Sequence, residues 1–167
     1  MESSSMVEMK VEGLTLDPVT NMPIIILRDL EGDRSLPIWI GIFEANAIAL
    51  EMEKVNPPRP MTHDLIKNIF DSVDANVTKV CVSDLKDNTF YATITVQVGE
   101  IVVEIDSRPS DAIAVALRMN ATILVEEKVL KEAKTFDISP DTALGEDDQW
   151  KTWIKDVKPE DFGNVDQ

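Results

Sequence analysis

The sequence predicts an α+β fold in which duplicated βββα units, with mixed or antiparallel sheets, pack around a shared core and are joined by a linking helix. Patterns of three strands and a helix occur twice, at about residues 7–55 and 76–120. A shift of 67 residues aligns six identical residues in the 17 positions of 36–52 and 103–119. The repeated order and the matching alanines together indicate an internal duplication.

The first unit begins with alternating apolar and polar residues at 7–16, which is typical of a half-buried strand. An apolar run at 23–27 and a short segment at 36–40 predict two further strands. After Gly41, apolar residues recur at helical spacing, so a helix is expected there. It must end before the proline-rich connector at 56–60, since proline interrupts helices.

The linking helix is predicted over residues 62–74, with Thr62 as its N-cap and an apolar stripe along one face. The second unit continues with strands separated by two-residue turns, then a helix, a last strand and a short helix. These elements are expected at residues 77–85, 89–98, 101–105, 109–119, 123–125 and 127–133.

A change in composition divides the chain into a domain at 1–133 and an appendage at 134–167. Residues 137–149 contain five acidic residues and no basic one, which predicts an acidic loop. Trp150 and Trp153 then begin a helical pattern. Because two tryptophans one turn apart rarely face water, and because short sheets leave exposed edges, we expect a homo-oligomer, a dimer or higher.

Charge and hydropathy limit the partners. Lysine and arginine total 16 against 31 acidic residues, a net charge of −15, so the overall field repels a polyanion. A nucleic acid would therefore need a local basic pocket or bridging divalent cations. The chain has no apolar run long enough to span a bilayer, no secretory signal and one cysteine, Cys81. We therefore expect no membrane partner and a cytoplasmic location.

One candidate site lies at residues 106–111, where the second unit's third strand meets its helix. A helix start offers unpaired N–H groups, and Arg108 adds a bidentate donor, so this segment can hold a phosphate. Asp106 and Asp111 flank it and are suited to a hard divalent ion. The alternative is structural: Ser107 or Ser110 caps the helix, and Asp111 pairs with Arg108.

A second candidate site lies at the start of the linking helix. His63 is the only histidine, so a general base that titrates near neutral pH is either this residue or a perturbed carboxylate. Arg59 precedes it on the stiff connector, and Glu44 begins the first unit's helix as a further carboxylate. Two alternatives stay open: His63 is a structural or surface residue, and Glu44 pairs with the dipole of its own helix.

Four ordered motifs resemble the bifunctional nuclease (BFN) domain family, with coverage from about residue 7 to residue 133. They are LPIWIGIFEANAIAL at 36–50, PPRPMTHDL at 57–65, DLKDNTFY at 84–91 and IDSRPSDAIA at 105–114. The terminal KPEDFG at 158–163 is similar to bacterial members as well. The resemblance implies DNase and RNase activity, and it implies compact oligomers with a mixed α+β fold.

With this resemblance, the sequence predicts a nuclease that hydrolyses phosphodiesters with Mg²⁺ or Mn²⁺. The predicted roles are catalytic for His63, Asp106 and Asp111, phosphate-binding for Arg59, Arg108 and Ser110, and metal-binding for Glu44, Asp106 and Asp111. Two alternatives stay open. One is a non-catalytic binding or regulatory module with an anion pocket at the Arg108 helix start, and the other is a purely structural role for that segment.

Overall fold

A computed structural model describes residues 4–133, and the predicted acidic loop and tryptophan helix lie outside these residues. Three strands and a helix occur in order twice, separated by one helix. The elements are β1 (Met6–Leu16), β2 (Pro23–Asp29), β3 (Ser35–Trp39), α1 (Ile42–Met52), α2 (Thr62–Ser72), β4 (Ala75–Lys86), β5 (Thr89–Val98), β6 (Ile101–Ser107), α3 (Pro109–Met119), β7 (Thr122–Glu126) and α4 (Glu127–Glu132).

All seven strands form one mixed sheet in the order β3-β2-β1-β7-β4-β5-β6. The strands pair antiparallel except for β4 and β7, which run parallel. The predicted α+β class with a mixed sheet is therefore confirmed, and β7 is the strand that joins the two halves. A common origin of the two units stays a prediction, since the order of elements alone does not test it.

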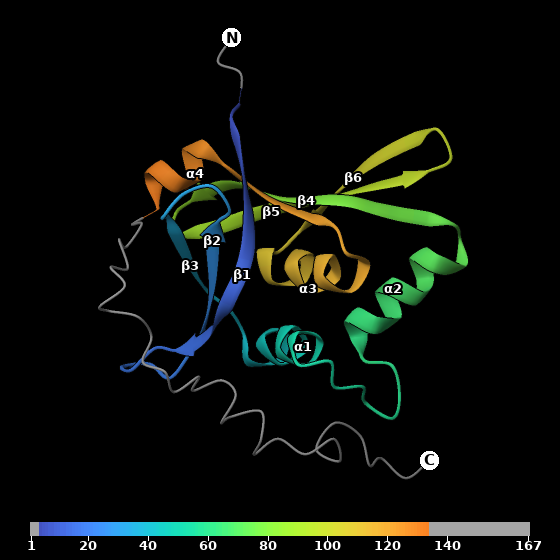
Figure 1. Cartoon of the computed structure of the whole chain (residues 1–167), viewed down its shortest axis with the longest axis horizontal. Coiled ribbons are helices and arrows are strands. Elements are labelled where there is room, and N and C mark those ends of the chain that lie inside the picture. Colours follow the sequence, from blue (N-terminus) through green and yellow to red (C-terminus); the bar gives the residue numbers. More distant parts are fainter. Residues whose placement is uncertain (1–3, 134–167) are drawn as a thin grey trace.

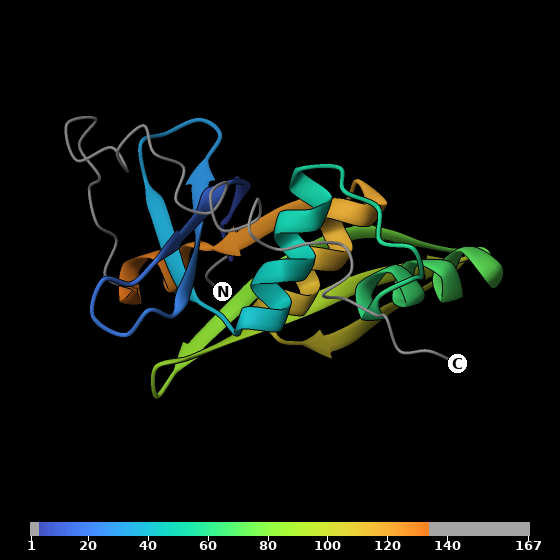
Figure 2. The ribbon, with the colours of Figure 1, turned by 90° about the horizontal axis from the view of Figure 1, so that it is seen from below.

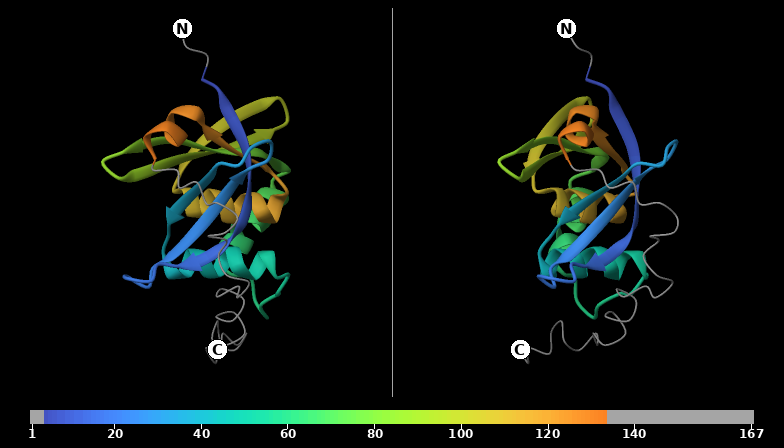
Figure 3. Two further views of the ribbon diagram at one scale, coloured as in Figure 1. Left: turned by 60° about the vertical axis from the view of Figure 1, so that its left-hand side comes forward. Right: turned by 90° about the vertical axis from the view of Figure 1, so that its left-hand side faces the viewer.

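Helices α1 and α3 pack against each other on one side of β4 and β5, and α4 lies on the other side (Figures 1 and 3). Figure 2 shows α1 crossing α3, with α2 beyond them along the same face. The sheet is strongly twisted: β1 and β2 run vertically in Figure 1, whereas β4 runs horizontally. The alanines of α1 and α3 allow this close packing; Ala45, Ala49, Ala112 and Ala116 are all buried.

Most element boundaries agree with the sequence pattern, and the turns explain why. Asp87 and Asn88 have positive φ angles of 50° and 59°, as a two-residue hairpin turn requires, and Gly99 has a φ of 60° in the next hairpin. Four ends differ from the predictions by two residues, and the others by one at most. The linking helix ends at Ser72 instead of 74, β2 extends to Asp29 instead of 27, β4 begins at Ala75 instead of 77, and β6 extends to Ser107 instead of 105.

None of the helices in residues 4–133 combines the length and the hydrophobicity that a bilayer span requires. Cys81 is buried in β4, and this burial raises the pKa of its thiol to about 11. The thiol therefore stays protonated near neutral pH.

Candidate functional site

The first turns of α1, α2 and α3 converge on a cavity of about 260 Å³. Its lining residues come from these turns, from the residues just before them and from the second turn of α1: Phe43, Glu44, Asn46, Ala47, Met61, Thr62, His63, Arg108 and Asp111. Because each helix start presents unpaired N–H groups and a partial positive charge, three such starts favour an anion in the cavity. The two sequence motifs around His63 and Arg108, separated in the chain, thus form one site.

Arg108 links α1 to α3 through one edge of its guanidinium. Its Nε donates to Asp111 Oδ2 at 2.8 Å, and its Nη2 donates to Glu44 Oε1 at 2.8 Å. The bonds to Asp111 and then to Glu44 raise the pKa of Arg108, so the group stays charged. Nη1 makes no hydrogen bond to any residue in 4–133, and the side chain is 65% exposed. Arg108 therefore retains donors for a ligand.

His63 lies behind Asp111. Its Nε2 is 2.8 Å from Asp111 Oδ1, and the side chains are 9% and 27% exposed, respectively. A protonated Nε2 donates to the carboxylate, so both oxygens of Asp111 accept hydrogen bonds, one from His63 and the other from Arg108. The carboxylate is held in one orientation at the edge of the cavity. A surface position for His63 is excluded, since the residue is buried.

The capping alternative for the Arg108 segment is only half right. Asp111 does pair with Arg108, as that alternative states. No side chain caps α3, however, because Arg108 occupies the N-cap and Ser107 Oγ donates to the Arg108 carbonyl at 2.9 Å. The N-cap of α2 also differs: Met61 takes it, with its amide donating to Asp64 Oδ2 at 3.0 Å, and Thr62 is the first helical residue.

Gly41 occupies the N-cap of α1, the position that Arg108 occupies in α3. A Cβ atom on Gly41 would collide with Glu44 Oε2. The missing side chain therefore lets Glu44 fold back over its own helix start and reach Arg108.

Asp106 does not join this group. It pairs with Thr93, whereas the neighbouring Ile105 pairs with Ile94 of the core. Since paired residues share a face and successive strand residues alternate, the Asp106 side chain points to the sheet face opposite Ile94. The sequence placed Asp106 beside Asp111 because β6 was expected to end two residues earlier, at residue 105.

The carboxylates predicted to bind a metal do not fit a shared ion. Glu44 and Asp111 both bind Arg108, and Asp106 lies on the other face. Within residues 4–133 no three His, Cys, Asp or Glu side chains are placed to ligate one ion. A requirement for Mg²⁺ or Mn²⁺ stays a prediction.

Two predicted phosphate ligands lie elsewhere. Ser110 is buried and does not line the cavity. Arg59 is exposed and lines a separate cavity of about 200 Å³, together with Asp64 and Arg118.

Arg118 was not identified from the sequence. Its side chain is 3% exposed, and it donates from Nε to Asp64 Oδ1 at 2.8 Å. Burial alone would raise the pKa of Asp64, but the hydrogen bonds from Arg118 and the Met61 amide outweigh burial and hold that pKa below its ordinary value. The sequence pattern that could have identified Arg118 is a single charged residue within the last, apolar turns of α3.

Asn46 and Phe43 were missed as well. Asn46 is a polar residue in a stretch of α1 that is otherwise alanine, isoleucine and leucine, and it is buried where it lines the cavity. Phe43 is 84% exposed at the same cavity. An amide in an apolar run, preceded by an exposed aromatic residue one turn earlier, was the pattern that could have indicated them.

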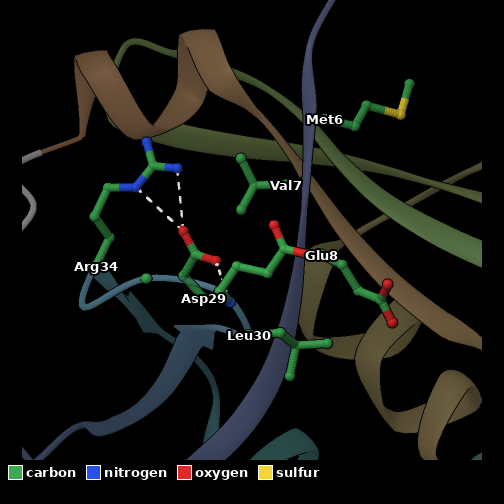
Figure 4. Close-up of a pocket in the computed structure, with 8 residues that line it drawn as sticks. Met6, Val7, Glu8, Asp29, Leu30 and Arg34 are labelled. Carbon is green, nitrogen blue, oxygen red and sulfur yellow. Dashed lines mark hydrogen bonds and ion pairs between the residues drawn. The ribbon is translucent and has the colours of Figure 1, made fainter.

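A larger cavity of about 540 Å³ lies beside the β2–β3 turn (Figure 4). Its polar centre is Arg34, which donates to Asp29 at 3.1 Å and to Glu127 at 2.7 Å. Burial alone would raise the pKa of Asp29, yet the Glu31 amide and Arg34 lower it to below its ordinary value. A side chain on Gly32 would press against Asp29 at 2.9 Å. These groups satisfy one another, so the cluster holds the turn in place.

Comparison with known proteins agrees with the fold and the motifs. Residues 25–137 match the family model described as the bifunctional nuclease domain. Two proteins from two strains of Mycobacterium tuberculosis, both described as uncharacterized, are each 40% identical over 162 residues, which span 93% of this chain and 97% of the relative. The molecule is an α+β domain with an arginine-lined cavity between three helix starts. It belongs to the bifunctional nuclease domain family.

Proposed function

We propose that this protein hydrolyses phosphodiester bonds of nucleic acid at the cavity between α1, α2 and α3. The observation that supports this most is the arrangement of Arg108, whose Nε and Nη2 are bound to carboxylates while Nη1 has no partner in residues 4–133. A guanidinium held in this way offers its remaining donors to a phosphate with little loss of side-chain freedom. Membership of the family supports the same activity.

In the proposed reaction a water oxygen attacks phosphorus, the ester P–O bond breaks, and the leaving oxygen takes up a proton from the solvent. Both His63 and Asp111 line the cavity, and the side chain of Asp111 is the more exposed of the two. Asp111 would therefore contact the attacking water and accept its proton. His63 would act as a positioning residue that holds this carboxylate. Arg108 would bind the phosphate oxygens as negative charge develops on them.

Asp111→Asn provides the decisive test, measured as hydrolysis of a fluorophore-labelled RNA or DNA oligonucleotide. We expect a loss of about 10²-fold or more, since a general base typically contributes about 10²–10⁴-fold. Asp71→Asn is the matched control, because Asp71 is an exposed carboxylate that pairs with Lys67 on α2, away from the cavity. The assay is run with EDTA, with Mg²⁺ and with Mn²⁺, which also tests the predicted metal requirement.

Unchanged hydrolysis by Asp111→Asn, with the variant folded by circular dichroism, would contradict the proposal and would identify a contaminating nuclease. The salt dependence gives a second check. Since the chain carries a net charge of −15, moderate salt should screen its repulsion of a polyanion, and activity should first rise with ionic strength. A basic nucleic-acid binder would show the opposite trend from the lowest salt upward.

The same charge favours one alternative, a non-catalytic binding or regulatory module whose ligand is a small anion. The cavity contains two carboxylates, Glu44 and Asp111, against the single guanidinium of Arg108, so it attracts a long polyanion only weakly. This alternative predicts binding of a mononucleotide or inorganic phosphate without any hydrolysis, in the presence or absence of metal. A cytoplasmic location remains a prediction under either function.

We also propose that the protein assembles as a homo-oligomer through β6. This strand is the last in the sheet order, and its apolar residues Ile101, Val102, Val103 and Ile105 are all exposed. An exposed apolar edge is a template for pairing with another strand. Antiparallel pairing of two copies about Val103 sets Ile101 opposite Ile105 of the partner copy, and it keeps the two Glu104 carboxylates from facing each other directly.

Val103→Lys tests this interface, because it would place two ammonium groups opposite each other at the symmetry axis. We expect light scattering after size-exclusion chromatography to give a smaller mass for Val103→Lys than for the natural chain. Val19→Lys is a control, since Val19 is an exposed valine in the β1–β2 turn. An unchanged mass in the Val103 variant, or a monomeric natural chain, would contradict this interface.

A further inference from the structure

The cavity contains a polar side chain that the proposed hydrolysis does not use. Asn46 is 8% exposed, and its amide makes no hydrogen bond to any residue in 4–133. In this part of the chain every fully enclosed side-chain nitrogen and oxygen has a partner, so the polar atoms of Asn46 are not enclosed, and the residue lines the cavity. Its amide therefore offers donors and an acceptor to a ligand in the cavity.

Phe43 lies one helical turn before Asn46 and lines the same cavity. It is 84% exposed, which is unusual for a large aromatic side chain. Residues three apart on a helix lie on the same face, so the ring and the amide border one opening. An aromatic ring beside an amide is a combination that proteins use to stack a base and to bind its polar edge.

We propose that Phe43 and Asn46 form a subsite for one unpaired nucleotide. Its base stacks on Phe43, its polar edge binds Asn46, and its phosphate reaches Nη1 of Arg108. The inference rests on the proposed function in using the same Arg108, and it adds the substrate class: single-stranded nucleic acid, or an unpaired end. A base within a duplex would first have to leave its stack, and a second phosphate strand would add repulsion from a chain of net charge −15.

The experiment uses the full chain and measures binding by calorimetry at one ionic strength. The probes are the four ribonucleoside 5′-monophosphates and inorganic phosphate. Phe43→Ala should weaken mononucleotide binding by about five- to a hundredfold, the range that loss of base stacking produces, and should leave binding of inorganic phosphate unchanged. Ile42→Ala is the matched control, since Ile42 is the adjacent exposed apolar residue and does not line the cavity.

Two further variants separate recognition from folding. Phe43→Tyr keeps an aromatic face and should bind as the natural chain does. Asn46→Leu keeps the size of the side chain but removes its donors and acceptor, so it should bind nucleotides several-fold more weakly and should discriminate less among the four bases. In cleavage assays, the natural chain should prefer a single strand over a duplex of the same sequence, and Phe43→Ala should lose most of that preference.

The outcomes distinguish the two proposals. If Phe43→Ala binds all four mononucleotides as the natural chain does, or if no mononucleotide binds while nucleic acid is cleaved, the subsite is refuted and the proposed hydrolysis stands. If nucleotides bind and depend on Phe43 but nothing is cleaved, hydrolysis is refuted and the subsite stands. Equal cleavage of duplex and single strand would likewise refute the assignment of substrate class.

Discussion

Two arginines near opposite ends of α3 make similar contacts and differ in what they leave unbound. Arg108 precedes the helix and Arg118 lies in its last turn, and each pairs with an acidic residue at the third position of a helix. Arg118 is buried, and its three nitrogens donate to Asp64 and to the carbonyls of Ala114 and Ala47. Arg108 is 65% exposed, and its Nη1 has no partner in residues 4–133.

The comparison shows that an ion pair alone does not reveal the role of an arginine. A guanidinium bonded through all its nitrogens and removed from water joins elements of the fold, as Arg118 joins α1, α2 and α3. A guanidinium held through one edge and open on the other is a preformed binding group. The completeness of the hydrogen bonding, together with burial, separates the two roles.

Arg118→Met should have the largest effect on stability. It leaves the Asp64 carboxylate and two buried carbonyls without their partner, and breaking a buried pair typically costs about 3–5 kcal/mol. Urea unfolding followed by circular dichroism measures this loss. A change in the free energy of unfolding below about 1 kcal/mol would mean that Arg118 is no more structural than a surface arginine.

Arg108→Gln should have a large effect on activity and a small effect on stability. Hydrolysis should fall by about 10²–10³-fold, the usual cost of losing a donor to developing charge. The free energy of unfolding should change by less than about 1 kcal/mol, because the guanidinium of these ion pairs is largely exposed to solvent.

Arg108→Lys should not restore the activity, since lysine cannot bind two carboxylates and present a second edge. The control is Arg28→Gln, an exposed arginine that pairs with Glu12 on β1 and does not line the cavity.

Asp64→Asn should reduce the acid sensitivity of the fold. The pKa of Asp64 in the folded protein lies below its ordinary value of 3.8, so its pairing stabilises the fold fully above that value. This contribution is lost as the pH falls through the lower, folded pKa. Unfolding measured at neutral pH and at several values below 3.8 should therefore give a shallower decline for the variant. An identical decline would show that other carboxylates, such as Asp29, control acid unfolding.

Gly41→Ala should have the smallest effect. The new methyl group collides with Glu44 Oε2, and the flexible end of that side chain can move away from Arg108. Since φ of Gly41 is −72°, alanine causes no backbone strain. We expect a stability change below about 1 kcal/mol and a several-fold loss of activity. Full activity would mean that Glu44 does not orient Arg108.

The sequence identified the elements well because their signals are local. Turn residues such as Asp87, Asn88 and Gly99 determine where hairpins close, and Pro109 marks a helix start. His63, Arg108 and Asp111 were identified as candidates from their residue types and their positions at helix starts. That they form one cluster depends on α2 approaching α3, which no local pattern specifies.

The predictions of site residues were wrong or incomplete where the position of a side chain depended on strand register or on a single polar residue in a helix. Asp106 lies within β6, whose end was predicted two residues too early, and alternation along the strand directs its side chain to the other face. Arg118 and Asn46 were overlooked because an apolar helix suggests packing alone. In both cases one polar residue within an apolar stretch of a helix was the informative exception.

The position of β7 has a consequence for synthesis on the ribosome. This strand is the seventh in the chain yet fourth in the sheet, and it lies between β1 and β4. The first half can therefore form its own strands early, but the start of β1 has no neighbour on that side until residues 122–126 emerge. The nascent chain carries an unpaired edge for most of its translation, and a product truncated before Thr122 would retain it permanently.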